Sequence, residues 1–429
     1  MTSRNPTRAA LMRDPNFRWL TSGAFMSTLG DQFTLIALPW LVLQITGDPL
    51  ALGLTLAIMS APRAVFILVG GALVDRHSPK QVFMLSKFAN AILLAMLAFL
   101  VLSGGITMPL VYALALGIGL ASAFGLPSAT SMLPHAIAAQ QLQAANAFMM
   151  GMRQITMLAG PLLAGLLVAL SGHGGNRLAD ARGLGIAFAL DCASFLLSAW
   201  TLSKVRLHAP APSAGRQAIL RSIAAGLAMA WNDRTLRTCF LYWGAISLVV
   251  GGALQVALPV LAGTLGGAAA LGLLMGAHGA GTLLGMVLSG AVGRLRIGTL
   301  GSTLLAIDVV VGLLFVPLGM VGSVWQGAAL MVPIGLLAGF MQVSVFSWIQ
   351  TRVPREMLGR TMSLFMFIFM GLAPMAAALA GWLMHSVTLP QLFAGAGLLL
   401  SCAAALAFVL TPMRAMADPD SARIPATPS

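Results

Sequence analysis

The sequence predicts an all-α membrane protein with twelve transmembrane helices in two six-helix, pseudo-symmetric halves. Its composition, its evenly spaced apolar runs and an internal repeat all indicate this fold. Of 429 residues, 59% are hydrophobic and only 8% are charged, whereas a soluble domain carries about 25% charged residues. So little polar surface excludes a soluble enzyme, a coiled coil and a disordered chain.

Apolar runs bounded by charged residues, glycine, proline or small polar residues give the individual spans, since a helix needs roughly 20 residues to cross a bilayer. The predicted spans are 17–43, 50–73, 82–103, 108–133, 145–171, 183–203, 236–262, 268–292, 298–320, 325–350, 359–385 and 390–411. They define an N-terminal arm (1–16), a first six-helix bundle (17–203), a polar central loop (204–235), a second bundle (236–411) and a tail (412–429).

The basic residues predict the orientation. Twenty of the 24 Lys and Arg residues fall at the termini, in the central loop, or in and beside the loops that follow spans 2, 8 and 10, where Lys87 is counted as a loop edge. The positive-inside rule makes this side cytoplasmic. We therefore expect both termini in the cytoplasm and the chain in the cytoplasmic (inner) membrane. The net charge of +13 then reflects orientation and does not indicate a nucleic-acid partner.

The two halves repeat at an offset of about 219 residues. Asp14 aligns with Asp233, and Leu52-Gly53-Leu54 aligns with Leu271-Gly272-Leu273. Ala37-Leu38-Pro39 matches Ala257-Leu258-Pro259 one residue further on. An even number of spans per half predicts parallel repeats related by an axis along the membrane normal. A substrate path between such halves is the expected design.

The loop between spans 2 and 3 resembles a motif of the major facilitator superfamily. Gly71, Asp75, Arg76 and Lys80 match its pattern, whereas Ser78 and Pro79 depart from the usual glycine and basic residue. The resemblance covers essentially the whole chain. It implies that these four matching residues gate the transport cycle; the alternative is a solvated turn that fixes the topology.

Further segments resemble the drug-efflux branch that contains macrolide exporters and the enterobactin exporter. They include Leu29-Gly30-Asp31, Asp191-Cys192-Ala193-Ser194-Phe195 and Val353-Pro354-Arg355-Glu356. Gly160, Pro161 and Gly165 in span 5 resemble an antiporter motif that the family associates with exporters. The alternative is an ordinary small-residue helix interface. The arginine that the family often carries in span 4 is absent, which leaves the usual proton-coupling route in question.

Ionisable residues inside the spans are the candidates for proton coupling. A charge at the bilayer centre costs about 2.5–3.5 kcal/mol on insertion scales, so it needs a partner, a water-filled space or neutralisation. The candidates are Asp31, Arg63, Arg153 and His278. Asp31 with either arginine could form an ion pair that opens on protonation, or a static pair that fixes the packing. Asp191 and Asp308 are expected to be structural.

The substrate would bind polar, aromatic and methionine side chains, because flexible methionines repack around varied apolar ligands. The candidates are Ser27, Thr34, Tyr242, Trp243, Gln255, Gln342, Trp348, Met362, Phe365, Met366 and Phe369. Filling of the core, or contact with lipid, is the alternative for each one.

No catalytic constellation and no phosphate-binding loop appears, and Glu356 is the only glutamate. The sequence thus predicts no enzyme, no ATP-driven pump, no cofactor and no metal site. We expect a monomeric secondary transporter, whose partners are a small molecule, protons and the lipid bilayer. It would export a hydrophobic or amphipathic compound by alternating access, in exchange for protons. The alternatives are a lysolipid or metabolite transporter of the same fold and a passive channel.

Overall fold

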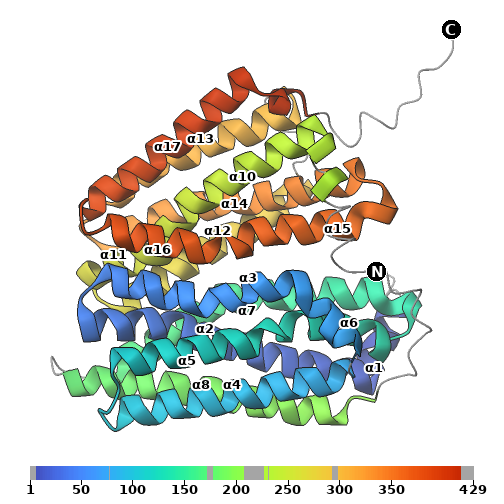
Figure 1. Ribbon diagram of the computed structural model, residues 1–429, viewed down its shortest axis with the longest axis vertical. Coiled ribbons are helices and arrows are strands. Elements are labelled where there is room, and N and C mark those ends of the chain that lie inside the picture. Colours follow the sequence, from blue (N-terminus) through green and yellow to red (C-terminus); the bar gives the residue numbers. More distant parts are fainter. Residues whose placement is uncertain are drawn as a thin grey trace. The chain divides into compact units, whose positions relative to one another are not determined.

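The computed structural model describes residues 6–76, 78–171, 177–206, 227–229, 231–291 and 298–416, and it is built from helices (Figure 1). Within these residues, twelve helical segments are long and apolar enough to cross a membrane. They coincide with the twelve predicted spans and confirm the predicted fold class.

The first six spans are formed by seven helices, because the fourth span divides at Phe124. They are α2 (Pro15–Thr46), α3 (Pro49–Arg76), α4 (Pro79–Leu102), α5 (Met108–Ala123) with α6 (Gly125–Ala136), α7 (Leu142–Ser171) and α8 (Arg177–Lys204). The short helices α1 (Pro6–Arg13) and η1 (Ala139–Gln141) precede α2 and α7.

Two of the last six spans contain a π-helical turn. The spans are α10 (Arg234–Gly252) with the π-helix η2 (Ala253–Ala257) and α11 (Leu258–Leu265), α12 (Ala268–Ala291), α13 (Leu300–Leu318), α14 (Val324–Arg352), α15 (Arg355–Met366) with the π-helix η3 (Phe367–Gly371) and α16 (Ala373–Leu383), and α17 (Leu389–Leu410). The short helix η4 (Pro412–Ala415) follows α17.

The helices form two compact units. The first comprises Met1–Ala51, Ile58–Arg216 and Gly266–Gly276, and the second comprises Leu52–Ala57, Gln217–Leu265 and Ala277–Ser429. The start of α3 belongs to the second unit and the start of α12 belongs to the first, which are the two exceptions to a division in chain order. In the second unit a Cβ on Gly53 would collide with the Ala377 carbonyl, and in the first a Cβ on Gly272 would collide with the Pro161 carbonyl. Backbone contact at these repeat-related glycines explains the two exceptions.

The internal repeat is also visible in how corresponding helices begin. The carboxylate of Asp14 accepts hydrogen bonds from the backbone N–H groups of Asn16 (2.8 Å) and Phe17 (3.3 Å) at the start of α2. The carboxylate of Asp233 accepts from those of Thr235 (2.9 Å) and Leu236 (3.2 Å) at the start of α10. Both satisfy N–H groups that lack an intrahelical partner, so this sequence alignment marks equivalent positions in the two bundles.

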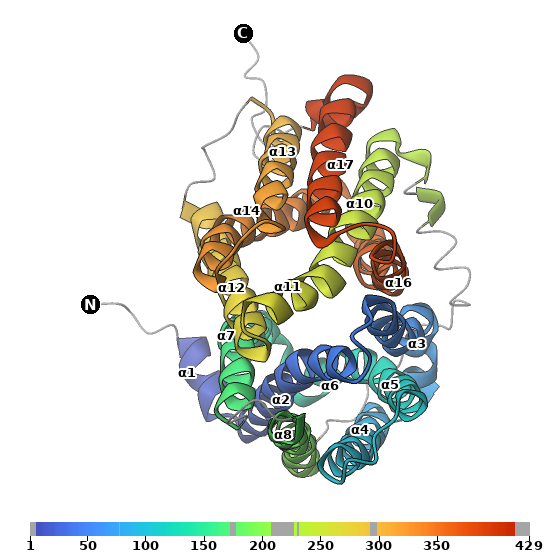
Figure 2. The ribbon, with the colours of Figure 1, turned by 90° about the vertical axis from the view of Figure 1, so that its left-hand side faces the viewer.

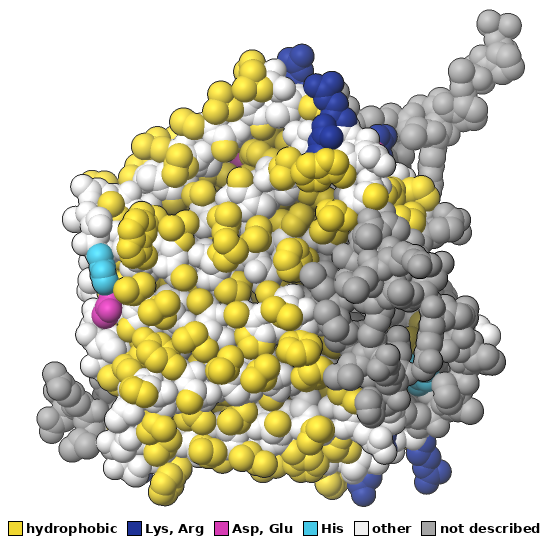
Figure 3. Space-filling view, viewed as in Figure 1, with side chains coloured by type: hydrophobic (Ala, Val, Ile, Leu, Met, Phe, Trp, Pro, Cys, Tyr) yellow, Lys and Arg dark blue, Asp and Glu magenta, His cyan; other side chains and the backbone are white. Residues whose placement is uncertain are grey.

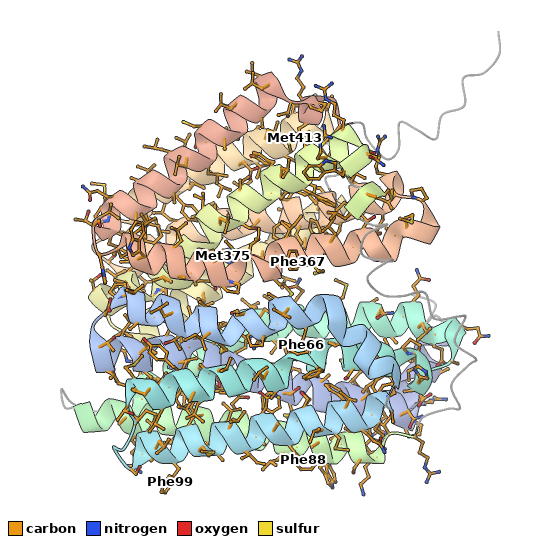
Figure 4. The ribbon with its side chains drawn as sticks, in the orientation of Figure 1. Phe66, Phe88, Phe99, Phe367, Met375 and Met413 are labelled. Atoms are coloured by element: carbon orange, nitrogen blue, oxygen red, sulfur yellow. The ribbon has the colours of Figure 1, made fainter. Side chains whose placement is uncertain are left out.

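The surface is apolar, as a lipid environment requires. On the face shown in Figure 3, hydrophobic side chains cover most of the visible helices and the visible Lys and Arg lie at the margins. Helix α4 illustrates the pattern, because Phe88 and Phe99 project outward along the edge of its unit (Figure 4). Its opposite face, which includes Ser86, Lys87 and Asn90, is buried.

Candidate functional site

Asp31, the leading candidate, occupies the middle of α2 and has an exposed side chain. Three cations from other helices act on it electrostatically, namely Lys87 most strongly, then Arg63 and Arg153. A lipid-facing position would not bring cations from α3, α4 and α7 close to one carboxylate. Asp31 therefore lies on the protein side of α2, and its exposure leaves it accessible to water.

Asp191 lies within the contact between α2 and α8. Its side chain is only 1% exposed, and it accepts hydrogen bonds from Thr34 Oγ1 (2.5 Å) and Ser194 Oγ (3.2 Å). Thr34 belongs to α2, one turn after Asp31, so the two carboxylates are linked through a single helical turn. A Cβ on Gly30 would collide with Ser194 Oγ and Asp191 Oδ1, which means that this glycine lets Asp191 come up against α2.

Lys87 is the residue that sequence reasoning misplaced. The charge count treats it as an edge of the cytoplasmic loop, although it falls within the predicted span 82–103; the structure places it in the third turn of α4, where it is 7% exposed. Its ammonium lies over the ring of Phe83 at 4.9 Å and the ring of Phe195 at 4.7 Å, where the electron-rich ring faces stabilise a cation. Asp31 and Asp191 are the acidic groups that act on it. The sequence does contain a signal for a buried polar face here, because Ser86 and Asn90 lie four residues apart on either side of Lys87.

Three helices thus bring these groups together. Figure 2 shows α8 beside both α2 and α4, and these two pairs make extensive contact. Further polar contacts join α4 to α5. Ser122 Oγ donates to Asn90 Oδ1 (3.1 Å), and Ser86 Oγ donates to the Ala121 carbonyl (2.6 Å). Interhelical hydrogen bonds of this kind satisfy polar groups that cannot reach water.

The two predicted arginines differ in their surroundings. Arg153 on α7 is exposed, whereas Arg63 on α3 is half-buried and its Nε atom has no hydrogen-bond partner within the described part of the chain. Both act on Asp31. Lys87 acts on Asp31 as well, and the ion pair of Asp31 with either arginine stays a prediction. The proton-coupling role assigned to these residues stays a prediction.

Two polar candidates beside Asp31 have buried side chains. Ser27 is 4% and Thr34 is 9% exposed, and the hydroxyl of Thr34 donates to Asp191. They do not line open space as expected, because a neighbouring helix with matching polar groups covers this side of α2. The predicted polar stripe mainly serves contact between helices.

The predicted gating loop is only partly described. Helix α3 runs through Gly71, Asp75 and Arg76, but their side chains lie outside the described residues. Lys80 is described, and its Nζ atom donates to the carbonyls of Ser203 (3.0 Å) and Val205 (2.6 Å) at the end of α8. A cation at a helix C-terminus satisfies free carbonyls and complements the helix dipole. Lys80 therefore ties the start of α4 to the end of α8.

The antiporter-like motif lies at close helix contacts in the first unit. A Cβ on Gly160 would collide with the side chain of Gln32 on α2, and a Cβ on Gly165 would lie 2.9 Å from the Cα of Gly272 on α12. Pro161 is buried between them. The motif thus makes small-residue interfaces, and its predicted link to export is not tested by these contacts.

The C-terminal candidates separate into core and exposed residues. Trp243, Trp348 and Phe365 belong to a buried hydrophobic cluster, with Tyr242 and Met362 packed against it. The centroid of the Trp243 ring lies 5.7 Å from that of Phe365 and 6.4 Å from that of Trp348. These three side chains fill the core and do not face open space, because aromatic rings from α10, α14 and α15 pack edge to face. The half-buried or exposed candidates are Gln255, His278, Gln342, Met366 and Phe369.

Asp308 is also partnered. It is 4% exposed on α13 and accepts a hydrogen bond from the Tyr242 hydroxyl of α10 (2.7 Å). This agrees with the expected structural role, which nonetheless stays a prediction. Within the described residues, no cluster of His, Cys, Asp and Glu could hold a metal ion.

Comparison with known proteins agrees with this architecture. The model of the Major Facilitator Superfamily matches residues 20–378. The multidrug efflux pump Tap of Mycobacterium tuberculosis is 27% identical over 418 residues, which cover 94% of each chain. Tap of Mycolicibacterium fortuitum is 31% identical over 230 residues, a match that spans about half of each protein (52%).

Other relatives are more distant. The enterobactin exporter EntS of Shigella dysenteriae is 25% identical over 361 residues, covering 82% of this chain and 80% of the exporter. The crystal structure of the nucleoside transporter NupG superposes with a TM-score of 0.69 at 16% identity, over 94% of this chain and 98% of that one; this likeness shows the fold alone. The chain therefore belongs to the major facilitator superfamily and is a multi-pass membrane transport protein, not an enzyme.

Proposed function

We propose that this protein exports a hydrophobic or amphipathic small molecule across the cytoplasmic membrane, by alternating access and in exchange for protons. Asp31 is the carboxylate that binds the transported proton. Both termini lie in the cytoplasm in this proposal, which the distribution of basic residues favours.

Export is supported by the relatives. Proteins named as a multidrug efflux pump and as an enterobactin exporter match most of this chain, at 27% and 25% identity. Their shared direction of transport favours export here. Their different cargoes leave the substrate class to be decided by the side chains of this chain.

The observation that carries proton coupling is the position of Asp31. It is an exposed carboxylate in the middle of a membrane-spanning helix, and three cations act on it. Cations favour the ionised carboxylate, whereas the loss of water around it favours the protonated form. A carboxylate between these opposing influences can change its protonation when the local access to water changes, which is what an antiporter needs.

The exposed C-terminal candidates support an apolar or amphipathic cargo. Met366 is 37% and Phe369 is 44% exposed, and Gln342 is exposed as well. Methionine and phenylalanine offer adaptable apolar contact, and glutamine adds a hydrogen-bonding group. Their side chains would accept compounds that share shape and apolar character more than one specific functional group.

Inverted membrane vesicles test the proposal. Vesicles that contain the protein are energised with a proton gradient, and uptake is measured for a panel of lipophilic cations, neutral drugs and anionic chelators. We expect saturable uptake of at least one class, with the substrate dissipating part of the gradient. Uptake that rises linearly with concentration would identify a channel, and uptake of lysolipid alone would identify the alternative cargo.

The Asp31→Asn variant tests the proton site within the same assay. We expect gradient-driven uptake to fall by at least about tenfold, because an amide cannot carry the proton, while substrate exchange without a gradient persists. Asp48→Asn is the matched control: Asp48 follows α2 outside the membrane, where its side chain accepts a hydrogen bond from the Leu50 backbone, and an amide oxygen can still accept it. Full gradient-driven uptake by Asp31→Asn would remove Asp31 from the mechanism.

A further inference from the structure

Three ionisable groups from three helices of the first unit act on one another electrostatically, and the proposed function does not use two of them. Lys87 of α4 is the strongest cationic neighbour of Asp31, ahead of Arg63 and Arg153. Asp191 of α8 acts on Lys87 as well, and Asp31 and Asp191 act on each other. Lys87 is therefore shared electrostatically between two carboxylates.

Lys87 and Asp191 are both held in place by packing. The ammonium of Lys87 lies between the rings of Phe83 and Phe195, and Phe195 follows Asp191 by one helical turn. The carboxylate of Asp191 is held by the hydroxyls of Thr34 and Ser194. Lys87 is thus held by α4 and α8, Asp191 is held by α2 and α8, and helix α8 is common to both buried groups.

Asp31 differs from both partners because its side chain is exposed, so it can exchange a proton with water. The charges then set a constraint. Asp31 is also acted on by Arg63 and Arg153, whereas Lys87 is the cation that acts on Asp191 within the described residues. Ionised Asp31 therefore competes with Asp191 for this ammonium, and an unbalanced buried charge is costly. Protonation of Asp31 ends the competition and leaves the ammonium to Asp191.

We propose that Lys87 is the positioning cation for the proton site at Asp31 and that Asp191 is its alternative partner. While Asp31 is ionised, Lys87 stabilises it together with Arg63 and Arg153. When Asp31 takes a proton from water, one O–H bond forms, Lys87 stays an ammonium, and its charge is balanced by Asp191 instead. This exchange rests on the proposed function. It also places a cation for Asp31 in α4, which is the third span. The fourth predicted span, 108–133, carries no charged residue.

Infrared titration of the purified protein in lipid nanodiscs tests the exchange without any substrate. The carbonyl stretch of protonated carboxyl groups is recorded against pH for the native protein and its variants. We expect Asp31→Asn to abolish the main titrating band. Lys87→Met should move its midpoint to higher pH by about one unit or more, because loss of a facing cation favours the protonated carboxyl. Lys87→Arg should keep the native midpoint.

The Asp191→Asn variant carries the opposite prediction. Removal of a nearby carboxylate should move the midpoint to lower pH, and the double variant with Lys87→Met should return it towards the native value, because the two shifts oppose each other. Lys204→Met is the matched control, since Lys204 also lies over an aromatic ring, that of Trp200, but at the end of α8. We expect no shift in that variant.

The outcomes separate this inference from the proposed function. An unchanged midpoint in folded Lys87→Met or Asp191→Asn, a shift of both in one direction, or a titrating band that survives Asp31→Asn overturns the exchange. If Lys87→Met does not fold, Asp191→Asn alone decides. A protein that shows the opposite shifts but no gradient-driven transport refutes the exporter and leaves the exchange standing.

Discussion

At the scale of single residues, the buried carboxyl of Asp308 depends on one tyrosine. The Tyr242 hydroxyl donates to Asp308 Oδ2 at 2.7 Å, and Asp308 is 4% exposed. A buried polar group that loses its partner retains its desolvation cost without compensation. The pair therefore contributes to the contact between α10 and α13.

The Tyr242→Phe variant tests that contribution. Phenylalanine fills the same space but removes the donor, so we expect a loss of about 1–3 kcal/mol in stability. The loss should appear as a lower Tm of the purified protein in nanodiscs. Tyr112→Phe is the control, because Tyr112 is the only other tyrosine in the chain. Equal Tm values for both variants would show that the hydrogen bond contributes nothing measurable.

The same scale shows what residue patterns could predict. Asp31 was identified from its position inside a span, which is a local property of the sequence. Residue patterns predict Arg63 and Arg153 as partners of Asp31, but they do not predict Lys87. Lys87 lies close to the basic loop along the chain, so its sequence neighbours assign it to the cytoplasmic side of the membrane. Its burial depends instead on Phe195 of α8, which is distant in the sequence.

At the scale of helices, α2 and α8 approach closely at Gly30, where a Cβ would collide with Ser194 and Asp191. We expect Gly30→Ala to separate the helices, lower the Tm by several degrees and weaken proton-driven transport. Gly151→Ala is the control, because nothing lies within 4 Å of a Cβ placed at Gly151 of α7. Alanine there should keep or slightly raise stability, since glycine costs roughly 0.5–1 kcal/mol in a helix. A Gly30→Ala protein as stable as the control would contradict the close contact.

The π-helical turns also belong to this scale. Proline lacks an N–H group, so the carbonyl four residues earlier loses its helical partner. Pro259 frees the carbonyl of Gln255 in η2, and Pro374 frees that of Met370 in η3. Pro39 has the same local pattern as Pro259, yet α2 stays α-helical. Sequence therefore predicts where a helix is weakened, and packing decides whether it changes register.

At the scale of the whole molecule, the charge distribution predicts the sidedness of every loop. The turn after α4, which contains the exposed Ser103, should face the outside, and the exposed Arg414 after α17 should face the cytoplasm. In a protein with the three native cysteines replaced by serine, a membrane-impermeant maleimide should label Ser103→Cys in intact cells. Arg414→Cys should be labelled only after permeabilisation. The reverse pattern would invert the proposed orientation.

The sequence by itself determined the number and position of the spans, the internal repeat and the family. Each of these depends on local hydropathy or on short motifs, which a linear reading captures. Only the tertiary structure decided that Thr34 holds Asp191, that Lys87 is buried against the rings of Phe83 and Phe195, and that three predicted aromatic candidates fill the core. Those outcomes depend on which helix faces which, because a buried polar or aromatic side chain takes its role from partners far away along the chain.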